Sequence, residues 1–527
     1  MRDRLYADPA GKFLHDAILD SCNRFGEKSA LVDVSMRDAT GASKRLSYAE
    51  FGEAVISAAH GLIAAGTRPG DRLGIFLPNS WEFCVACHAV TLAGGIPTPL
   101  NPSYREREVS YQLENSGASL LITNGPLISG MGFNQLPELR AIYTTREHVA
   151  GSVPFANLLN RERRVLPGPT ASPEEVLAAL PYSSGTTGLP KGVRLTHANL
   201  LTNVYQFLVP GEAATFTQDE NVLCFLPLYH IYGLNVLMNP TLIAGGTLVL
   251  MPRFDPAAVC QIITKEQITF LPMVPPVLNA LSLAAECGEF PPSHKIRAAK
   301  SGAAPLAPEL PVRFRSLTGI PIKQGYGMTE ASPVTHCGFI EPELYKPDSI
   351  GMPMAHTDCR IVREDGKEAG PGECGELVMR GPQFMRGYWN APEASAEVLR
   401  EGWYWSGDIA QRDERGFFTI VDRRKEMIKY KGFAIAPAEV ESVLLEHPKV
   451  QDCGVVGRPD GECGEAPCAF VVLRPGNDSS TALEAELCGH VAERLTKYKQ
   501  PREIRFVSGI PRNPSGKILR RELRAQL

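Results

Sequence analysis

Short apolar runs alternate with longer amphipathic stretches through the first four hundred residues. Strand-like runs occur at 73–77, 119–123, 221–226, 246–251 and 268–271, and segments with apolar residues at helical spacing separate them. This rhythm is typical of α/β folds with largely parallel sheets. We therefore expect an α/β architecture for this part of the chain.

The pattern changes from about residue 351. The runs that follow are shorter and separated by turns, as at 359–362, 375–379 and 416–420. Short strands of this kind favour a small β-rich layer on the α/β body.

A charged cluster at 421–428 separates this layer from a new pattern. Apolar residues recur at helical spacing over 438–447, and strand-like runs follow at 452–457 and 469–473. These segments indicate a small α/β domain of about a hundred residues. We predict a large N-terminal domain at 1–422 and a smaller C-terminal domain at 423–527.

Composition limits the class of protein. With 527 residues, 44% hydrophobic and 21% charged, the chain is expected to be a globular protein of at least two domains. A net charge of -4 gives no general attraction to nucleic acid or to acidic membranes. An anionic ligand must therefore meet local positive charge.

No feature of the sequence indicates export or a membrane span. The N-terminus lacks the apolar core of a secretory signal, and glycine and proline interrupt the most apolar segments, 85–100 and 236–251. A Cys-x-x-Cys-His pattern at 84–88 matches covalent haem attachment, but it falls in an expected buried helix at 79–95. We expect reduced thiols in a cytoplasmic protein.

The segment 182–192 has the composition of a phosphate-binding loop. Its glycines let backbone N–H groups converge on an anion, while hydroxyl groups donate hydrogen bonds and a lysine supplies charge. The residues concerned are Ser183, Ser184, Gly185, Thr186, Thr187, Gly188 and Lys191. It is not a Walker loop, because Gly192 follows Lys191 where Ser or Thr is needed. A flexible linker has similar composition, but expected strands at 180–182 and 193–195 favour a clamped loop.

A second loop, 323–330, brings together an aromatic ring, a hydroxyl and a carboxylate. Tyr326 offers a face on which a purine could stack, and Thr329 and Glu330 could bind a Mg²⁺ ion carried by nucleotide phosphates. The alternative is a plain strand-to-helix turn with Glu330 in the first turn of the helix.

Two further positions carry suitable chemistry. Asp408 follows a Ser-Gly turn, where a carboxylate can accept hydrogen bonds from two ribose hydroxyls, although an Asx-turn would look the same. Lys517 lies on a loop bent by proline and glycine and can deliver a point charge to a reacting centre, although a surface role fits its composition equally well.

These features occur in an order that resembles the adenylate-forming enzymes, a superfamily of acyl-CoA synthetases, peptide-synthetase adenylation domains and luciferases. The resemblance extends from about 46–50 to 519–523. Within the superfamily the chain is most similar to 4-coumarate:CoA ligases and related aryl-CoA ligases, through the stretches 227–235, 300–306, 325–334 and 428–433. The resemblance implies two α/β subdomains and a β-rich layer in the N-terminal domain, with a mobile C-terminal domain.

The resemblance also implies a role for each motif. The loop from Ser183 to Lys191 would wrap the ATP phosphates, Glu330 would face Mg²⁺, and Asp408 and Arg423 would hold the ribose. The residues that would border the adenine and the acyl group are Gly302, Ala303, Ala304, Pro305, Gln324, Gly325, Tyr326, Gly327, Met328 and Thr329.

For the C-terminal part, the resemblance implies that Lys425 is the hinge and that Lys517 contacts the carboxylate and the α-phosphate during adenylation. Lys429, Lys431, Gly432 and Phe433 would border AMP and the tunnel for the pantetheine arm. One departure is Ala434, where coumarate ligases commonly carry glutamine, so a phosphate contact is missing or replaced.

The implied acyl pocket is an apolar slot suited to a flat acid. Its expected lining is His230, at the entry for the thiol, with Tyr232, Val236, Gly302, Gly327, Pro333 and Val334. We therefore expect a ligase that uses ATP, Mg²⁺ and coenzyme A to join CoA to a cinnamate- or benzoate-type acid through an acyl-adenylate. The alternatives are a medium-chain fatty acid as substrate, an acyl carrier protein as thiol donor, and a non-catalytic nucleotide- or acyl-binding regulator.

Overall fold

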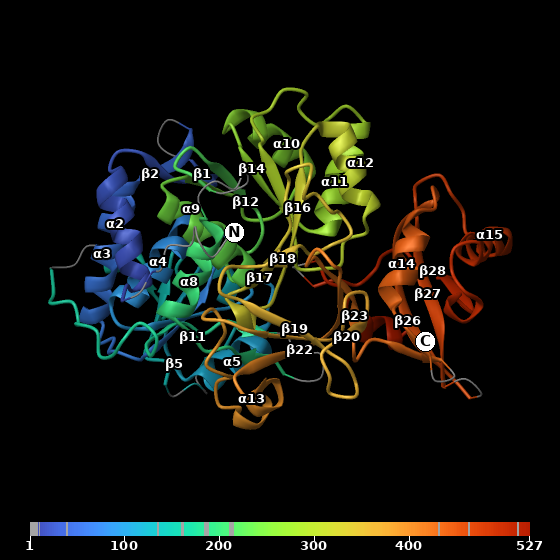
Figure 1. Ribbon diagram of the computed structural model, residues 1–527. Coiled ribbons are helices and arrows are strands. Elements are labelled where there is room, and N and C mark those ends of the chain that lie inside the picture. The colour runs from blue at the N-terminus through green and yellow to red at the C-terminus, as the bar shows by residue number, and fades with distance from the viewer. Residues whose placement is uncertain are drawn as a thin grey trace.

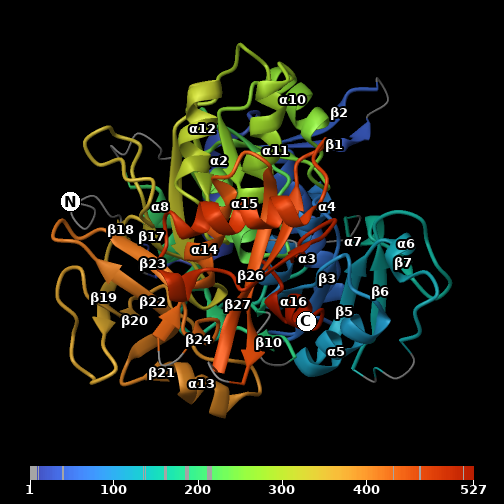
Figure 2. The same cartoon turned by 90° about the vertical axis from the view of Figure 1, so that its right-hand side faces the viewer.

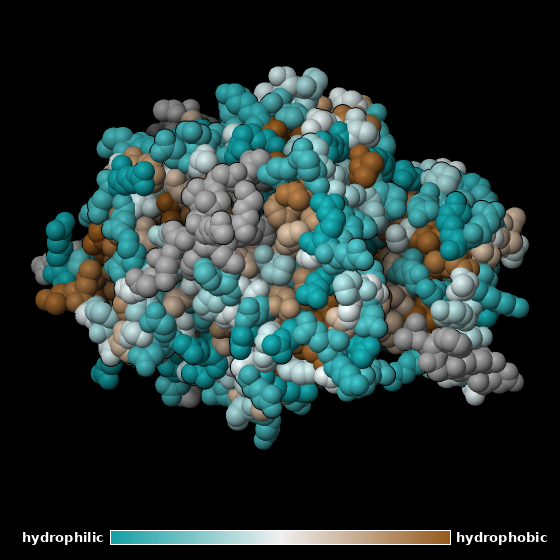
Figure 3. Space-filling model, viewed as in Figure 1, coloured by the Kyte–Doolittle hydropathy of each residue, from teal (hydrophilic) through white to brown (hydrophobic). Residues whose placement is uncertain are grey.

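The computed structural model shows a large α/β body with a smaller lobe beside it (Figure 1). It describes residue 9 and residues 11–37, 41–133, 136, 138–159, 163–183, 189–209, 216–430, 433–461, 464–513 and 516–527. The space-filling view shows a largely polar face with small scattered apolar groups (Figure 3).

The first sheet of the body is parallel and has the order β4-β3-β5-β6-β7. Its strands are β3 (Arg72–Phe76), β4 (Ile96–Pro99), β5 (Ala118–Thr123), β6 (Ala141–Thr144) and β7 (Val153–Pro154). The helices of this region are α3 (Tyr48–Ala64), α4 (Trp81–Leu92), α5 (Glu106–Ser116), α6 (Gly125–Ile128) and α7 (Ala156–Leu159).

The second sheet has nine strands in the order β18-β17-β16-β15-β14-β12-β13-β1-β2, parallel from β16 to β1 and antiparallel at both edges. Its strands are β1 (Ser29–Arg37), β2 (Ser43–Ser47), β12 (Asn221–Cys224), β13 (Thr247–Leu250), β14 (Phe270–Met273), β15 (Ala298–Ser301), β16 (Ile322–Gly327), β17 (Val334–Cys337) and β18 (Met352–Pro353). Its helices are α2 (Leu14–Phe25), α8 (His197–Phe207), the π-helix η1 (Gly233–Met238), α9 (Asn239–Ala244), α10 (Pro256–Lys265), α11 (Pro275–Glu286) and α12 (Glu309–Thr318).

Helix α4 joins the two sheets into one core, because it contacts β3 of the first sheet and β1 of the second. Its residues from Glu82 to Leu92 are all buried, as expected for a mostly apolar helix that is covered on both faces. Ser80 caps it by accepting the N–H of Phe83. Cys84 and Cys87 are buried within it, so the Cys-x-x-Cys-His pattern belongs to the core, as predicted.

An antiparallel layer follows, with β19 (Asp358–Val362), β20 (Cys374–Arg380), β21 (Leu399–Arg400), β22 (Trp403–Arg412) and β23 (Phe418–Arg423), and with helix α13 (Pro392–Val398) beside it. This is the predicted β-rich layer. Each strand pair is antiparallel, so turns of a few residues suffice to connect most of them.

The C-terminal lobe has its own hydrophobic core. Its elements are β24 (Ile428–Tyr430), β25 (Phe433–Ile435), α14 (Pro437–Leu445), β26 (Val450–Asp460), β27 (Gly464–Leu473), α15 (Thr481–Ala492), the short 3₁₀-helix η3 (Lys497–Lys499), β28 (Glu503–Phe506) and α16 (Arg520–Arg524). Figure 2 shows α14 and α15 lying across β26 and β27. The β26–β27 hairpin is longer than the sequence pattern suggested, because helices cover both of its faces and remove the alternation of polar residues.

The architecture confirms the predicted fold class, a large α/β N-terminal domain with a smaller α/β C-terminal domain. Among the helices of the described segments, none combines the length and the apolar character needed to cross a bilayer.

Candidate active site

The predicted phosphate loop projects from paired strands. Strand β9 (Tyr182–Ser183) pairs antiparallel with β10 (Lys191–Gly192), and β8 (Leu177–Ala179) pairs with β11 (Leu195–Thr196). Ser183 and Lys191 are direct cross-strand partners. The expected clamp at both ends is therefore confirmed. Ser184, Gly185, Thr186, Thr187 and Gly188 lie outside the described residues.

Glu330 links this hairpin to the second predicted loop. Its Oε1 accepts hydrogen bonds from Ser183 Oγ at 3.1 Å and from the hydroxyl of Tyr388 at 2.8 Å. Lys191 places its ammonium 5.5 Å from the centre of the Tyr388 ring. Glu330 is buried in the 3₁₀ turn Thr329–Ala331, so the turn holds a carboxylate against the base of the phosphate loop.

Backbone approaches shape the segment 302–328. A Cβ on Gly327 would lie 2.1 Å from the carbonyl oxygen of Pro333, to which the N–H of Met328 donates at 3.0 Å. A Cβ on Gly302 would lie 3.2 Å from the carbonyl oxygen of Gly325. Gly327 is required because two backbone segments meet there without room for a side chain, whereas at Gly302 the approach is merely close.

The backbone of Ala303 is strained. Its φ is 68°, in the left-handed region that a residue with a Cβ rarely adopts. Ala304 and Pro305 continue this loop after β15. The strain coincides with the segment expected to border the adenine, which is where such backbone strain tends to concentrate.

Tyr232 lies beside Gly302, another residue of the predicted acyl pocket. Its ring lies 3.7 Å from the position of a Cβ on Gly302, and its hydroxyl donates to the carbonyl oxygen of Lys300 at 2.9 Å. Val236 lies buried in the π-helix η1, a helix type that often marks functional sites. Asn235 of the same helix donates to Ser332 at 2.6 Å and so ties η1 to the segment that carries Pro333 and Val334.

His230 borders a cavity of about 40 Å³. The residues around it include Asn101, Tyr104, Tyr182, Tyr229, His230 and Thr329. Burial lowers the pKa of His230 to about 4. Its Nδ1 accepts the backbone N–H of Tyr232 at 3.2 Å, which fixes the neutral tautomer with the proton on Nε2.

The carboxylate of Asp408 contacts the guanidinium of Arg423 and the hydroxyl of Tyr326. Strands β22 and β23 place it directly opposite Arg423, whose Nε lies 3.1 Å from Asp408 Oδ1. The hydroxyl of Tyr326 donates to Oδ2. The backbone N–H of Asp408 donates to Ser406 Oγ at 3.0 Å, while the carboxylate itself faces Tyr326 and Arg423. Burial, and then the charge of Asp408, raises the pKa of Tyr326.

Lys517 sits on a turn whose base is formed by Asn513. The N–H of Lys517 donates to Asn513 Oδ1 at 2.8 Å, and the N–H of Asn513 donates to the carbonyl of Lys517 at 2.9 Å. The neighbouring Gly516 packs against α11, since a Cβ there would lie 3.2 Å from Pro276 Cδ. The turn of the C-terminal domain therefore docks on the N-terminal domain.

The docked lysine is electrostatically coupled to the ribose-type pair. Burial and, next, the nearby Arg423 cation lower the pKa of Lys517 to about 8, while Glu426 and Asp408 oppose this shift. Asp408 and Lys517 are far apart along the chain, so local sequence patterns do not predict their proximity, although the family resemblance places both beside one nucleotide.

The structure describes only some of the predicted hinge and tunnel residues. Lys425 and Lys429 have exposed side chains, and the N–H of Lys429 donates to Glu465 at 2.8 Å. Lys431 and Gly432 lie outside the described residues. Phe433 and Ala434 are placed by their backbones alone, opposite Tyr430 and Lys429 in the β24–β25 pair. Their roles stay predictions.

Two residues near the site were assigned no role by the sequence patterns. Tyr388 reaches Glu330 because its backbone pairs with Val193 beside the phosphate hairpin. Lys300 lies buried beneath β16, with its Cε 2.5 Å from the position of a Cβ on Gly325 and its Nζ 3.6 Å from the centre of the Phe207 ring. A lysine inside a β-strand pattern was the available signal for the second.

Two family models match the chain. The family model "AMP-binding enzyme" matches residues 18–389, and the model "AMP-binding enzyme C-terminal domain" matches residues 439–517. The chain is 36% identical to a long-chain-fatty-acid–CoA ligase of Bacillus subtilis (strain 168), with 97% of this chain and 94% of the relative covered. It is 37% identical to 4-coumarate-CoA ligase 1 of Narcissus pseudonarcissus, with 98% and 93% covered.

Among solved structures, the anthranilate CoA ligase AuaEII in complex with anthranoyl-AMP superposes with a TM-score of 0.88 at 25% identity, over 98% of both chains.

Proposed function

The chain belongs to the AMP-binding enzyme family and is an acyl-CoA ligase, and we propose that it acts on an aromatic acid of the cinnamate or benzoate type through an acyl-adenylate. In the first half-reaction, a carboxylate oxygen bonds to the α-phosphorus of ATP and pyrophosphate leaves. In the second, the CoA sulfur bonds to the acyl carbon, AMP leaves, and the thiol proton is released. A carboxylate needs the first step because oxide is a poor leaving group.

The observation that carries the proposal is the docking of the Lys517 turn against Pro276, with Lys517 coupled to Arg423 and Asp408. Two anions, the carboxylate and the α-phosphate, must approach each other in the first half-reaction. A preorganised ammonium offsets their repulsion. Holding both reactants in attack geometry contributes about 7 to 11 kcal/mol, so an enzyme nucleophile is not required.

The donor set of the site fits a magnesium ion bound to the nucleotide phosphates. Glu330 offers a hard carboxylate at the base of the phosphate loop, beside the hydroxyl of Ser183. The ion would neutralise phosphate charge there. Lys191 supplies a further cation on the same side of the loop.

The relatives and Tyr232 support the aromatic assignment. The relatives include a 4-coumarate-CoA ligase, and a similar solved structure is an anthranilate CoA ligase, although another relative is a long-chain-fatty-acid–CoA ligase. The hydroxyl of Tyr232 is bonded to the backbone carbonyl of Lys300, and its ring lies 3.7 Å from the Cβ position of Gly302. An aromatic ring in the expected acyl pocket favours packing against an aromatic acid, and a medium-chain fatty acid is the alternative for the same apolar lining.

The test is a panel of acids assayed for pyrophosphate release and for acyl-CoA. We expect the largest kcat/KM for cinnamates or benzoates, with AMP and thioester formed in equal amounts. A larger kcat/KM for medium-chain fatty acids contradicts the aromatic assignment. If adenylate forms but added CoA gives no thioester, free CoA is not the acceptor. Thioester formed on an acyl carrier protein would then identify the carrier as the acceptor.

A further inference from the structure

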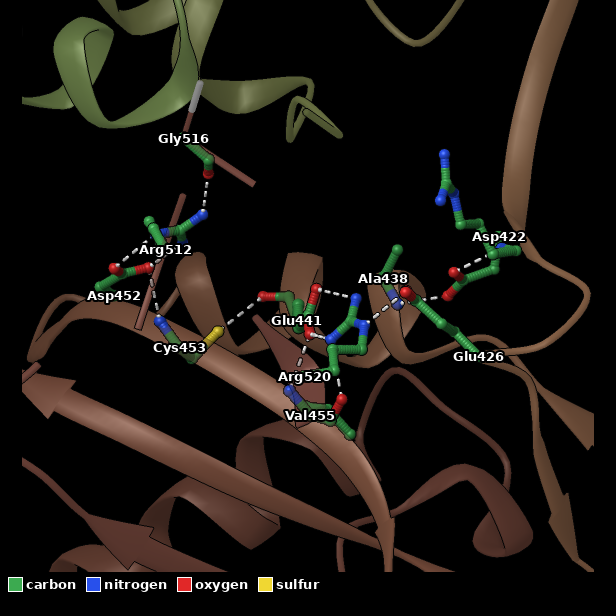
Figure 4. Close-up of polar contacts among 11 residues, drawn as sticks. Asp422, Glu426, Ala438, Glu441, Asp452, Cys453, Val455, Arg512, Gly516 and Arg520 are labelled. Carbon is green, nitrogen blue, oxygen red and sulfur yellow. Dashed lines mark hydrogen bonds and ion pairs between the residues drawn. The ribbon is translucent and has the colours of Figure 1, made fainter. Parts of the chain in front are cut away.

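A buried carboxylate contacts the C-terminal domain at the point where the chain leaves the β-rich layer. Asp422 is 6% exposed at the end of β23. Its Oδ2 accepts the backbone N–H of Ala438 at 3.0 Å, and its Oδ1 accepts the N–H of Arg423 at 2.6 Å (Figure 4). One side chain thus joins the nucleotide-side residue Arg423 to the first turn of α14.

Helix α14 depends on this contact because its own sequence offers no side-chain cap. Ala436 precedes the helix and Pro437 opens it, and the cap position makes no side-chain hydrogen bond. The first N–H groups of a helix need partners from outside it, and a carboxylate there also interacts favourably with the helix dipole. The cap of α14 is supplied by the other domain.

On the C-terminal side, Arg520 ties α14 to the segment that carries Lys517. Arg520 is buried and donates from Nε to Glu426 at 2.8 Å, from Nη2 to Glu441 at 3.2 Å, and from Nη1 to the carbonyl of Val455 at 2.8 Å (Figure 4). Glu441 lies on α14, one turn after Ala438. Arg520 follows Lys517 by three positions. A contact that holds α14 in place therefore also holds the segment of Lys517 in place.

Two further contacts join the domains beyond Lys425 in the described part of the chain. Gly516 packs on Pro276, and Asn279 donates to the carbonyl of Gln451 at 3.4 Å. Before Lys425, Arg424 also pairs with Glu376 at 3.1 Å. The Asp422 bond is shorter and involves a charge, and bonds of that kind are worth more than neutral ones.

We propose that Asp422 is a positioning residue that latches the C-terminal domain in the orientation where Lys517 faces Arg423 and Asp408. Asp422 and Ala438 lie on opposite sides of Lys425. A rotation of the C-terminal domain about Lys425 therefore separates them and uncaps α14. The latch is closed for adenylation and open for thioester formation, and this part of the inference rests on the proposed two-step reaction.

The latch is tested by Asp422→Asn and Asp422→Ala with the two half-reactions measured separately. Loss of a hydrogen bond to a charged group lowers the population of the closed orientation by about tenfold or more. Asp422→Ala should therefore slow acyl-adenylate formation by about tenfold, while thioester formation from supplied acyl-adenylate is unchanged or faster. Asp422→Asn should show a smaller loss, because its amide oxygen still accepts the Ala438 N–H.

The matched control is Glu439→Gln. Glu439 lies next to Ala438 on the same helix, but its partner is Lys499 of the same domain, at 2.7 Å. Removing this charge should leave the ratio of the two half-reactions unchanged. A general loss of stability would lower both half-reactions in Asp422→Ala alike, and that result, or unchanged adenylation, overturns the latch.

A second readout needs no reaction. Backbone hydrogen exchange in the nucleotide-free enzyme should be faster for the first turn of α14 in Asp422→Ala than in the wild type or in Glu439→Gln. Unchanged exchange there overturns the latch. If the wild type forms no adenylate, the proposed function is wrong. Faster exchange in Asp422→Ala than in the wild type would still show that Asp422 caps α14.

Discussion

At the scale of single residues, Lys517 is expected to stabilise negative charge only in the first half-reaction, acyl-adenylate formation. Lys517→Ala should lower the rate of acyl-adenylate formation by about a hundred- to a thousand-fold, the usual cost of removing one preorganised charge contact. Thioester formation from supplied acyl-adenylate should be largely spared. Quenched-flow assays of each half-reaction measure both rates, and an equal loss in both would argue against separate geometries.

The titration of Lys517 gives a second expectation. Its pKa is lowered to about 8, so the ammonium loses its proton as the pH rises through that value. The kcat/KM of adenylation, which reports groups of the free enzyme, should therefore fall above about pH 8. The free energy of unfolding should change in the opposite direction. Because the pKa of Lys517 is lower in the folded protein than the ordinary value of 10.5, burial of the charged form costs stability below about pH 8. This cost disappears as the pH rises from about 8 to 10.5. A rate profile that stays flat to pH 10 would contradict a charged Lys517 in this step.

His230 should not titrate in the physiological range. Burial holds its pKa near 4, and its Nδ1 is occupied by the N–H of Tyr232. The rate of thioester formation from supplied acyl-adenylate should show no step between about pH 5.5 and 7.5, where a free imidazole would titrate. A step near pH 6.5 that disappears in His230→Asn would assign it a proton-transfer role instead.

At the scale of elements, the loop of Gly327 depends on contact between two backbones. Gly327→Ala would bring a Cβ to 2.1 Å from the carbonyl of Pro333, so one segment must move. Overpacking of this kind costs about 1 to 3 kcal/mol. We expect ATP affinity, measured by calorimetry, to weaken by about tenfold. Gly509→Ala is the control, because no atom lies within 4 Å of its Cβ position, and equal behaviour of the two variants would contradict the packing argument.

The elements show what the sequence could predict. The strands around the phosphate loop and the buried helix α4 followed from local patterns, since caps such as Ser80 and glycine stops are local signals. The contacts of Tyr388 with Glu330 and of Asp422 with Ala438 did not follow. The first pair is 58 residues apart. The second is 16 residues apart but crosses the expected hinge, so it depends on how the two domains pack.

At the scale of the whole molecule, the proposed two-step reaction predicts that the docked C-terminal domain adopts a second orientation. The Lys517 turn on Pro276, the Asp422 cap of α14 and the exposed turn at Lys425 together describe a closed adenylation geometry beside a candidate pivot. The family and the two-domain fold could be inferred from the ordered motifs. The orientation of the domains could not, because it depends on a few contacts across their interface.

The most direct test of the central claim is a single-turnover experiment with ATP and a cinnamate-type acid in the absence of CoA. The account predicts that enzyme-bound acyl-AMP and pyrophosphate accumulate to about one equivalent per active site, and that added CoA converts the adenylate to thioester and AMP. Release of ADP and phosphate, or thioester formed without a preceding adenylate, would contradict it.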